Sequence, residues 1–260
     1  MELKQLVTDL IAIDSTSSLS NEPIVSYIEH YFQGSSVGCK RLSTNANGKF
    51  NLLLTKGDPS EVGLTLCGHL DTVPASAESW KNCPWTLTER DGKWFARGSC
   101  DMKGFVAIAI QAIEKAVVIK GCLAVLLLCD EELGSFGAKH ILEHGLPVPI
   151  PKQVIIGEPT SLQVVRLHKG HLSMRVSIEG VSAHTGSPHL GKNALVEGGK
   201  VICAIAELAA KFANQRTETS VYFPEVAKFP VLTVSTVQSG SAINVVPDSC
   251  DIGIGMRLLP

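Results

Sequence analysis

The sequence of 260 residues lacks any long basic run, and its 23 lysines and arginines are balanced by 25 aspartates and glutamates. A chain with a net charge this close to zero and without a basic patch is a poor partner for nucleic acid or for an anionic membrane surface. It also lacks an apolar segment long enough to cross a bilayer. We therefore expect neither nucleic acid nor a membrane among its partners.

Paired cysteine motifs are missing as well, since none of the eight cysteines belongs to a CxxC pair. Cys67, Cys122 and Cys129 lie in apolar runs, where a free thiol behaves as a small hydrophobic side chain. This pattern favours reduced, buried thiols over a disulfide framework. The first residues, MELKQLVTDLIAI, carry acids early and are amphipathic, unlike a signal peptide. Together these absences predict a cytoplasmic protein.

Helical and strand-like segments alternate over the first 160 residues. Apolar residues recur at helical spacing from residue 2 to residue 13. The same kind of pattern predicts helices over residues 22–32, 101–116 and 135–145, and strands over residues 50–57, 63–70, 121–130 and 152–160, the last two of them buried. Such alternation is typical of an α/β fold with a mixed, mostly parallel sheet covered by helices on both faces.

The pattern of apolar and polar residues changes after Thr160. Residues 164–180 and 228–240 alternate apolar and polar side chains, as half-exposed strands do, and one long helix is expected between them over residues 193–214. We therefore predict a second domain of β-α-β-β type over residues 163–260, distinct from a first domain over residues 1–162.

Acidic and histidine side chains collect at the carboxyl ends of the predicted strands and at the start of one helix. In open α/β sheets, ligands bind outside the carboxyl ends of the strands. Taken singly, each residue is more simply a helix cap or a solvated loop end, where acids favour a helix N-terminus. Taken together, they indicate a divalent metal site, and zinc is the usual occupant when a histidine is included. The residues are His69, Asp71, Asp101, Asp130, Glu131, Glu132 and Glu158.

Four motifs in order, GHLDTVP, ARGSCDMKG, CDEELG and IIGEPTSLQVVRLHKGH, resemble those of the co-catalytic zinc amidohydrolase and peptidase family. The resemblance extends over nearly the whole chain and is strongest to the acetylornithine deacetylase branch. It implies a catalytic domain with an inserted α+β lid domain, here incomplete. The implied reaction is hydrolysis of a small N-acyl amino acid, N2-acetyl-L-ornithine to L-ornithine and acetate, in arginine biosynthesis. A succinyl-diaminopimelate desuccinylase, or another aminoacylase or dipeptidase of the family, is the alternative.

The resemblance also implies which residues bind metal. His69 and Glu158 would bind one zinc ion, Glu132 would bind the second, and Asp101 would bridge both. Cobalt also suits this ligand set. The peptide bond that follows Asp101 is often cis in this family, so we expect a cis bond here.

Two further acidic residues receive roles from the resemblance, and a third does not. Asp71 would hydrogen-bond His69 and fix its orientation. Glu131 would be the general base that takes a proton from the attacking water and returns it to the leaving amine. For Asp130 we expect only a structural hydrogen bond near the strand end.

Three residues of the second domain match family positions that face the substrate. His184 would stabilise the oxyanion and would come from the partner subunit of a homodimer formed through the lid. Asn244 and Arg257 would hold the carboxylate end of the substrate, for which an arginine fork is well suited. Simpler interpretations stay open, because His184 could be an exposed loop residue, Asn244 a turn residue and Arg257 a solvated strand end.

The sequence departs from the family at one metal ligand. The second zinc normally has a further histidine late in the chain, and no histidine in residues 1–260 replaces it by motif. We expect that the chain stops before that ligand. An alternative of another class therefore stays open: an inactive metal-binding fragment that keeps His69, Asp101 and Glu158 and binds one ion.

Overall fold

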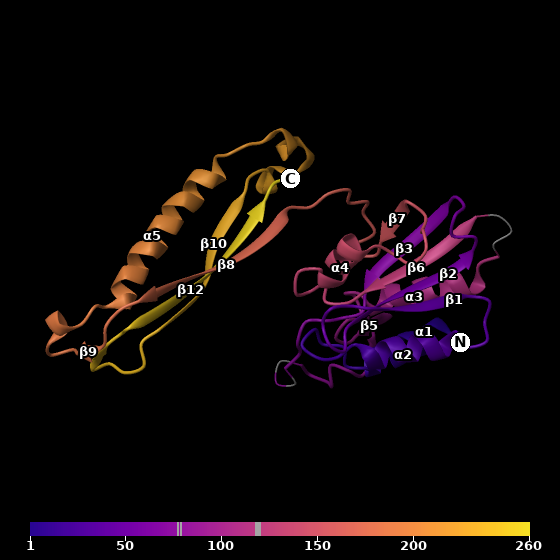
Figure 1. The fold of residues 1–260 in the computed structure, drawn as a ribbon, viewed down its shortest axis with the longest axis horizontal. Coiled ribbons are helices and arrows are strands. Elements are labelled where there is room, and N and C mark those ends of the chain that lie inside the picture. The colour runs from indigo at the N-terminus through magenta and orange to yellow at the C-terminus, as the bar shows by residue number, and fades with distance from the viewer. Residues whose placement is uncertain (77, 79, 118–120) are drawn as a thin grey trace. The chain divides into compact units, whose positions relative to one another are not determined.

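The computed structural model describes residues 1–260 except 77, 79 and 118–120, and it divides into two compact units (Figure 1). The first unit is Met1–Gln163 and the second is Val164–Pro260. The division falls one residue after the boundary expected between residues 162 and 163. Each unit has a hydrophobic core of its own.

The first unit is built on a five-stranded sheet in the order β1-β2-β6-β3-β7. Strands β6, β3 and β7 pair in parallel, whereas β2 is antiparallel to both β1 and β6. All strands except β2 therefore run in one direction, which confirms the predicted mixed, mostly parallel α/β sheet. The strands are β1 (Gly38–Ser43), β2 (Phe50–Gly57), β3 (Gly63–His69), β6 (Cys122–Leu128) and β7 (Gln153–Ile156); a separate hairpin pairs β4 (Thr88–Arg90) with β5 (Lys93–Phe95).

Helices cover both faces of this sheet. The alternation of side chains along β2 shows how: Leu52 and Leu54 enter the larger core, and Leu53 between them enters the smaller one. Helices α1 (Leu3–Ala12), α2 (Glu22–Tyr31) and α3 (Lys103–Lys115) pack on the larger core, and α4 (Phe136–His144) packs on the smaller. Helix α3 begins at Lys103 rather than at residue 101, which leaves Asp101 in the turn before it.

Strand β7 departs from the burial that its apolar sequence predicts. All four of its residues are exposed, and Ile156 is 62% exposed. β7 lies at the edge of the sheet with β3 as its partner, and its side chains belong to neither hydrophobic core of this unit. The prediction of a buried strand is therefore wrong for the chain as described, although the strand itself is present.

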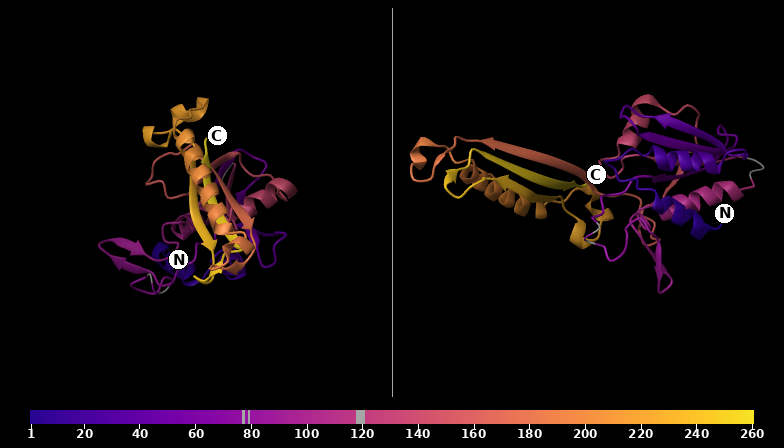
Figure 2. Two further views of the ribbon diagram at one scale, coloured as in Figure 1. Left: turned by 90° about the vertical axis from the view of Figure 1, so that its left-hand side faces the viewer. Right: turned by 90° about the horizontal axis from the view of Figure 1, so that it is seen from below.

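The second unit contains a three-stranded antiparallel sheet in the order β10-β12-β8. Helix α5 packs along one face of this sheet (Figure 2). The chain order β8, α5, β10, β12 is the β-α-β-β arrangement expected from the sequence. The elements are β8 (Gly170–Glu179), β9 (Ala183–His184), η2 (Pro188–Leu190), α5 (Ala194–Ala213), η3 (Glu218–Tyr222), η4 (Glu225–Ala227), β10 (Val231–Ser239), β11 (Val245–Val246) and β12 (Ser249–Leu258).

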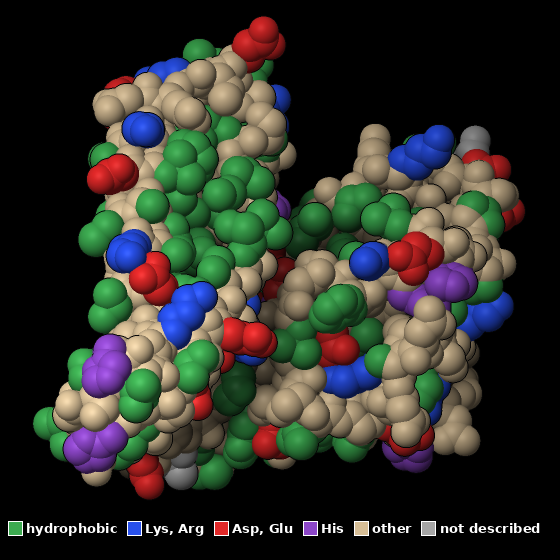
Figure 3. All heavy atoms as spheres, turned by 60° about the vertical axis from the view of Figure 1, so that its left-hand side comes forward, with side chains coloured by type: hydrophobic (Ala, Val, Ile, Leu, Met, Phe, Trp, Pro, Cys, Tyr) green, Lys and Arg blue, Asp and Glu red, His purple; other side chains and the backbone are tan. Residues whose placement is uncertain are grey.

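Many apolar side chains of the second unit are exposed. Leu172 and Met174 of β8 and Leu195, Val196 and Leu208 of α5 are all at least 39% exposed. Apolar side chains gather over one face of this unit (Figure 3). A contiguous apolar surface of this kind is typical of a site of protein association.

Candidate metal centre

The parallel strands β3, β6 and β7 have their carboxyl ends at the same end of the sheet. His69 is the last residue of β3, Glu131 and Glu132 follow β6, and Glu158 follows β7. Asp101 lies in the turn before α3. The structure brings these five side chains together from four distant segments, and the position of the strand ends explains why.

His69 lies at the centre of the cluster and is 1% exposed. Its Nε2 lies 2.9 Å from Asp101 Oδ1 and 3.8 Å from Glu158 Oε1. On the other side of the ring, Nδ1 lies 2.9 Å from the backbone oxygen of Asp71 and 3.5 Å from its carboxylate Oδ1. When Nδ1 donates to Asp71, the Nε2 of the neutral ring carries the lone pair that a metal ion requires.

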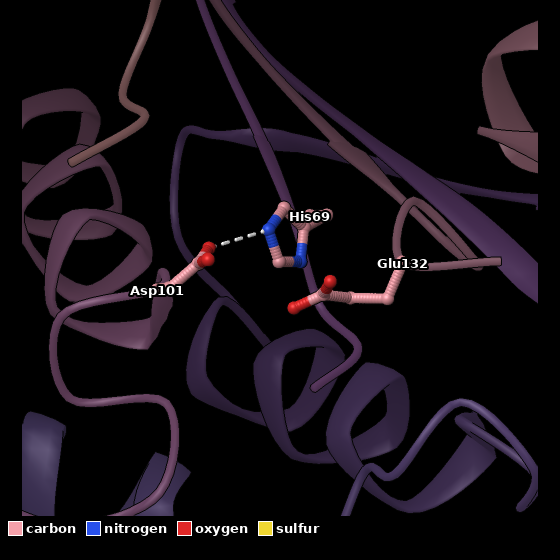
Figure 4. Close-up of side chains that lie close together, drawn as sticks. All are labelled: His69, Asp101 and Glu132. Carbon is pink, nitrogen blue, oxygen red and sulfur yellow. Dashed lines mark hydrogen bonds and ion pairs between the residues drawn. The ribbon is translucent and has the colours of Figure 1, made fainter. Parts of the chain in front are cut away.

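Two groups of ligand atoms in the cluster are compact enough to hold a metal ion. The atoms of His69, Asp101 and Glu132 lie within 4.8 Å of one another, as do those of His69, Glu131 and Glu158. The carboxylates of Asp101 and Glu132 point toward the imidazole of His69 from different sides (Figure 4). One imidazole surrounded by carboxylates is a donor set that fits zinc and similar divalent cations. The four predicted ligands are thus together, with the predicted general base among them.

The pKa values of His69 and Glu132 reflect an excess of negative charge in the cluster. Burial lowers the pKa of His69, but the hydrogen bond and charge of Asp71 and the charge of Asp101 outweigh it and raise the pKa to about 9. Burial, reinforced by the charge of Asp101, raises the pKa of Glu132. Protons bind tightly here because several carboxylates surround one imidazole, and a divalent cation would satisfy the same charges.

Asp71 holds the turn that carries Glu131 and Glu132. The N–H of Glu131 donates to Asp71 Oδ1 over 3.1 Å, and the N–H of Glu132 donates to Oδ2 over 3.2 Å. The hydroxyl of Ser17 also donates to Oδ2, over 2.8 Å. Although burial raises the pKa of Asp71, the contacts with His69, Ser17 and Glu131 outweigh it and lower the pKa. Asp71 therefore stays charged and orients both His69 and the turn.

The segment around Asp101 has the backbone geometry that the family resemblance predicts. The peptide bond between Asp101 and Met102 is cis. Met102 is fully buried, and its Sδ accepts the N–H of His69 over 3.3 Å. The segment that presents Asp101 thus packs directly against the end of β3.

Two of the contacts around the centre could not be read from the sequence. Ser17 belongs to the stretch STSS, which predicts only a break after the first helix. Asp130, for which we expected a structural hydrogen bond, accepts one from Lys49, whose Nζ lies 2.6 Å from its Oδ1 in a buried ion pair. No signal in the sequence connects either pair, because 81 residues separate Lys49 from Asp130 and 54 separate Ser17 from Asp71.

The second unit places two of its three predicted residues side by side. His184 of β9 pairs with Val245 of β11, and the N–H of Thr185 donates to the backbone oxygen of Asn244 over 3.1 Å. Arg257 lies near the last residue of β12 and pairs with Val231 and His171. Within this unit, Arg257 and the His184–Asn244 pair lie at opposite ends (Figure 1).

Comparison with known proteins agrees with the geometry of the site. Residues 65–243 match the model of peptidase family M20/M25/M40. The chain belongs to this family. It is 34% identical to an acetylornithine deacetylase from Myxococcus xanthus over 263 aligned residues, which cover 99% of this chain and 67% of the relative. The chain thus spans about two thirds of the length of that relative.

Solved structures share the fold. An M20 family metallo-carboxypeptidase from Sulfolobus solfataricus aligns with a TM-score of 0.81 at 17% identity, covering 100% of this chain and 72% of that one. A dinuclear metal binding peptidase of the M20 family from Bacillus subtilis aligns with a TM-score of 0.58 at 14% identity, covering 99% and 64%. Membership of this family places the chain among the metal-dependent amidohydrolases. Among the described residues, no helix has the length and apolar character needed to cross a membrane.

Proposed function

We propose that this chain carries the metal centre of a zinc-dependent amidohydrolase that converts N2-acetyl-L-ornithine and water to L-ornithine and acetate. The observation that carries the proposal is the cluster in which His69, Asp101 and Glu132 hold ligand atoms within 4.8 Å of one another, with Glu131 adjacent. The similarity to acetylornithine deacetylases over 99% of the chain supports the choice of substrate.

Neighbouring residues of the cluster have different proposed roles, metal binding and proton transfer. His69, Asp101, Glu132 and Glu158 would hold the metal, which supplies Lewis-acid catalysis and lowers the pKa of a water molecule when bound. Glu131 takes the proton of the attacking water and delivers it to the leaving amine of the product. Two zinc ions, with Asp101 between them, are the arrangement we propose, and cobalt suits the same ligands.

We assign substrate contacts to the second unit. The Nδ1 of His184 accepts the N–H of Gly186 over 3.0 Å, so the neutral ring of this exposed residue carries its proton on Nε2. That proton is available to stabilise an oxyanion, and we propose that it does so in a homodimer whose contact is the apolar face of this unit. Asn244 and Arg257, both exposed, would bind the carboxylate of the amino acid, and because they lie at opposite ends of this unit, the two side chains would come from different subunits of the homodimer.

A panel of substrates tests the reaction. Acetate release from N-acetyl-ornithine should exceed turnover of N-acetyl-methionine and of N-succinyl-diaminopimelate. Equal turnover of the first two would favour a broad aminoacylase, and preferred turnover of the third would favour a desuccinylase. Glu131→Gln should keep metal binding and lose turnover, because it preserves the size of the side chain and removes the proton acceptor. Full activity in Glu131→Gln would contradict the assigned base.

A second candidate function is metal binding without turnover. It is favoured by one observation, since both compact ligand groups share His69 as their single histidine. This candidate predicts one metal ion per chain and no acetate release at any metal concentration. A cytoplasmic location, which we also propose, fits either function and is supported by the eight free cysteines, four of them buried.

A further inference from the structure

Lys49 and Asp130 form an ion pair that is buried beside the metal centre. Their side chains are 11% and 7% exposed, and Nζ lies 2.6 Å from Oδ1. The same Nζ donates to the backbone oxygen of Ser17 over 2.6 Å. Burial of two charges is costly unless they are paired and hydrogen-bonded, and this pair meets both conditions.

The position of Asp130 suggests a role for this ion pair. Asp130 immediately precedes Glu131 and Glu132, and its backbone adopts the left-handed conformation with φ of +52°. Its backbone oxygen accepts the N–H of Phe136, which closes the turn. A residue in this conformation redirects the chain, so its side-chain anchor controls where the next two carboxylates point.

A second polar side chain, from β2, holds the two ends of the turn. The amide of Asn51 accepts the N–H of Cys129 and donates to the oxygen of Gly137, each over 2.9 Å. Asn51 lies in β2, two residues after Lys49, which immediately precedes the strand. Their side chains therefore point to the same face of the sheet. Lys49 thus contacts Asp130, the second residue of a turn whose ends Asn51 already fixes.

We propose that Lys49 is a positioning residue for the metal centre: its pairing with Asp130 fixes the turn from which Glu131 and Glu132 reach the cluster. The proposal rests on the proposed metal site. Asp71 binds the backbone N–H groups of Glu131 and Glu132 from one side. Lys49 binds the residue before them and joins it to Ser17, which itself donates to Asp71. The turn is thereby held by one connected set of hydrogen bonds.

The test compares Co²⁺ affinity and amide exchange in three variants of this chain. Lys49→Met removes the ammonium and keeps the length of the side chain. Lys49→Met combined with Asp130→Asn removes both charges, so it leaves no unpaired buried carboxylate and stays testable if the single variant unfolds. Lys56→Met is the matched control, because Lys56 belongs to β2, which Lys49 immediately precedes, and its Nζ donates to the backbone oxygen of Glu114, over 2.8 Å.

Co²⁺ binding is followed by its absorption spectrum, and exchange of the amides of Glu131 and Glu132 is followed in the metal-free protein. We expect Lys49→Met and the double variant to lose about 10- to 100-fold in Co²⁺ affinity, as removal of outer-shell partners does. Both amides should exchange faster in these variants. Lys56→Met should retain the affinity and exchange of the wild type.

Two results would overturn the inference. Wild-type Co²⁺ affinity in a folded Lys49→Met variant would show that the turn needs no anchor at Asp130. Recovery of wild-type affinity and exchange in the double variant would show that Lys49 only balances a buried charge. A wild-type chain that binds no Co²⁺ would instead contradict the proposed metal site, while the amide exchange would still report whether Lys49 fixes the turn.

Discussion

The imidazole of His69 and the carboxylate of Asp101 face each other directly, with Nε2 and Oδ1 2.9 Å apart. Both atoms are ones that a metal ion would use. Without a metal ion, a proton on Nε2 joins them, and a cation must displace that proton in order to bind. The relationship between these two residues therefore links metal binding to pH.

Metal binding should release a proton and strengthen as the pH rises. Because the pKa of His69 is raised to about 9, Nε2 is protonated at neutral pH in the metal-free protein. The apparent affinity for Zn²⁺ or Co²⁺ should increase by about tenfold per pH unit below 9 and then level off. Calorimetric titrations in buffers of different ionisation enthalpy measure the proton release directly. An affinity that does not change between pH 6.5 and pH 8.5 would contradict the assigned contact.

The metal-free protein should lose stability as the pH rises from neutral to 9. A histidine whose pKa rises from 6.5 in the unfolded chain to about 9 in the folded one stabilises the folded state fully below pH 6.5, and this contribution disappears as the pH passes 9. The contribution amounts to roughly 3 kcal/mol. Denaturant unfolding of wild type and His69→Gln across this range tests the prediction, and the variant should show a flatter profile. A parallel decline in both proteins would assign the effect to other groups.

Asp71→Asn should weaken both metal binding and the fold. The carboxylate of Asp71 accepts from the N–H groups of Glu131 and Glu132 at once, and an amide offers an oxygen on only one side. We expect a loss of about 10- to 100-fold in Co²⁺ affinity and of about 1–3 kcal/mol in the free energy of unfolding. Titration and denaturant unfolding of one preparation give both values. Unchanged Co²⁺ affinity would show that Asp71 does not orient the turn.

Gly137→Ala should destabilise the first unit. A Cβ at this position would lie 2.4 Å from Asn51 Oδ1 and 2.6 Å from the backbone oxygen of Cys129, both of which are fixed in hydrogen bonds. We expect a cost of about 1–3 kcal/mol in the free energy of unfolding. Gly199→Ala in α5 is the control, since a Cβ there meets nothing within 4 Å and a helical alanine is favoured by up to about 1 kcal/mol. Equal stability in the two variants would contradict the close packing at Gly137.

The sequence predicts where most of the candidate metal ligands lie because they follow the ends of apolar strands. The apolar runs before His69 and Glu131 identify β3 and β6, and parallel pairing brings the ends of such strands together whatever the details of packing. Periodicity also places α5 within one residue at each end. These features depend on local pattern and on general rules of sheet topology.

What the sequence could not predict depends on contacts between distant segments. The sequence pattern does not predict strand β1, in which Cys39 and Lys40 are both exposed. The side chains of β7 are exposed and belong to neither hydrophobic core of the first unit, which the apolar sequence of the strand does not reveal. The pairing of Lys49 with Asp130 joins residues 81 positions apart, and nothing in the stretch NGKF marks a buried ammonium.

The central claim is that His69, Asp101, Glu132 and Glu158 hold a divalent metal, and its most direct test is the zinc content per chain after equilibrium dialysis. The measurement compares wild type with Asp101→Asn and with the remote control Lys56→Met. The account predicts bound zinc in the wild type and in the control, and a substantial loss of zinc in Asp101→Asn, because the proposed bridging carboxylate is removed. A wild-type chain without zinc, or an Asp101→Asn variant with as much zinc as wild type, would contradict it.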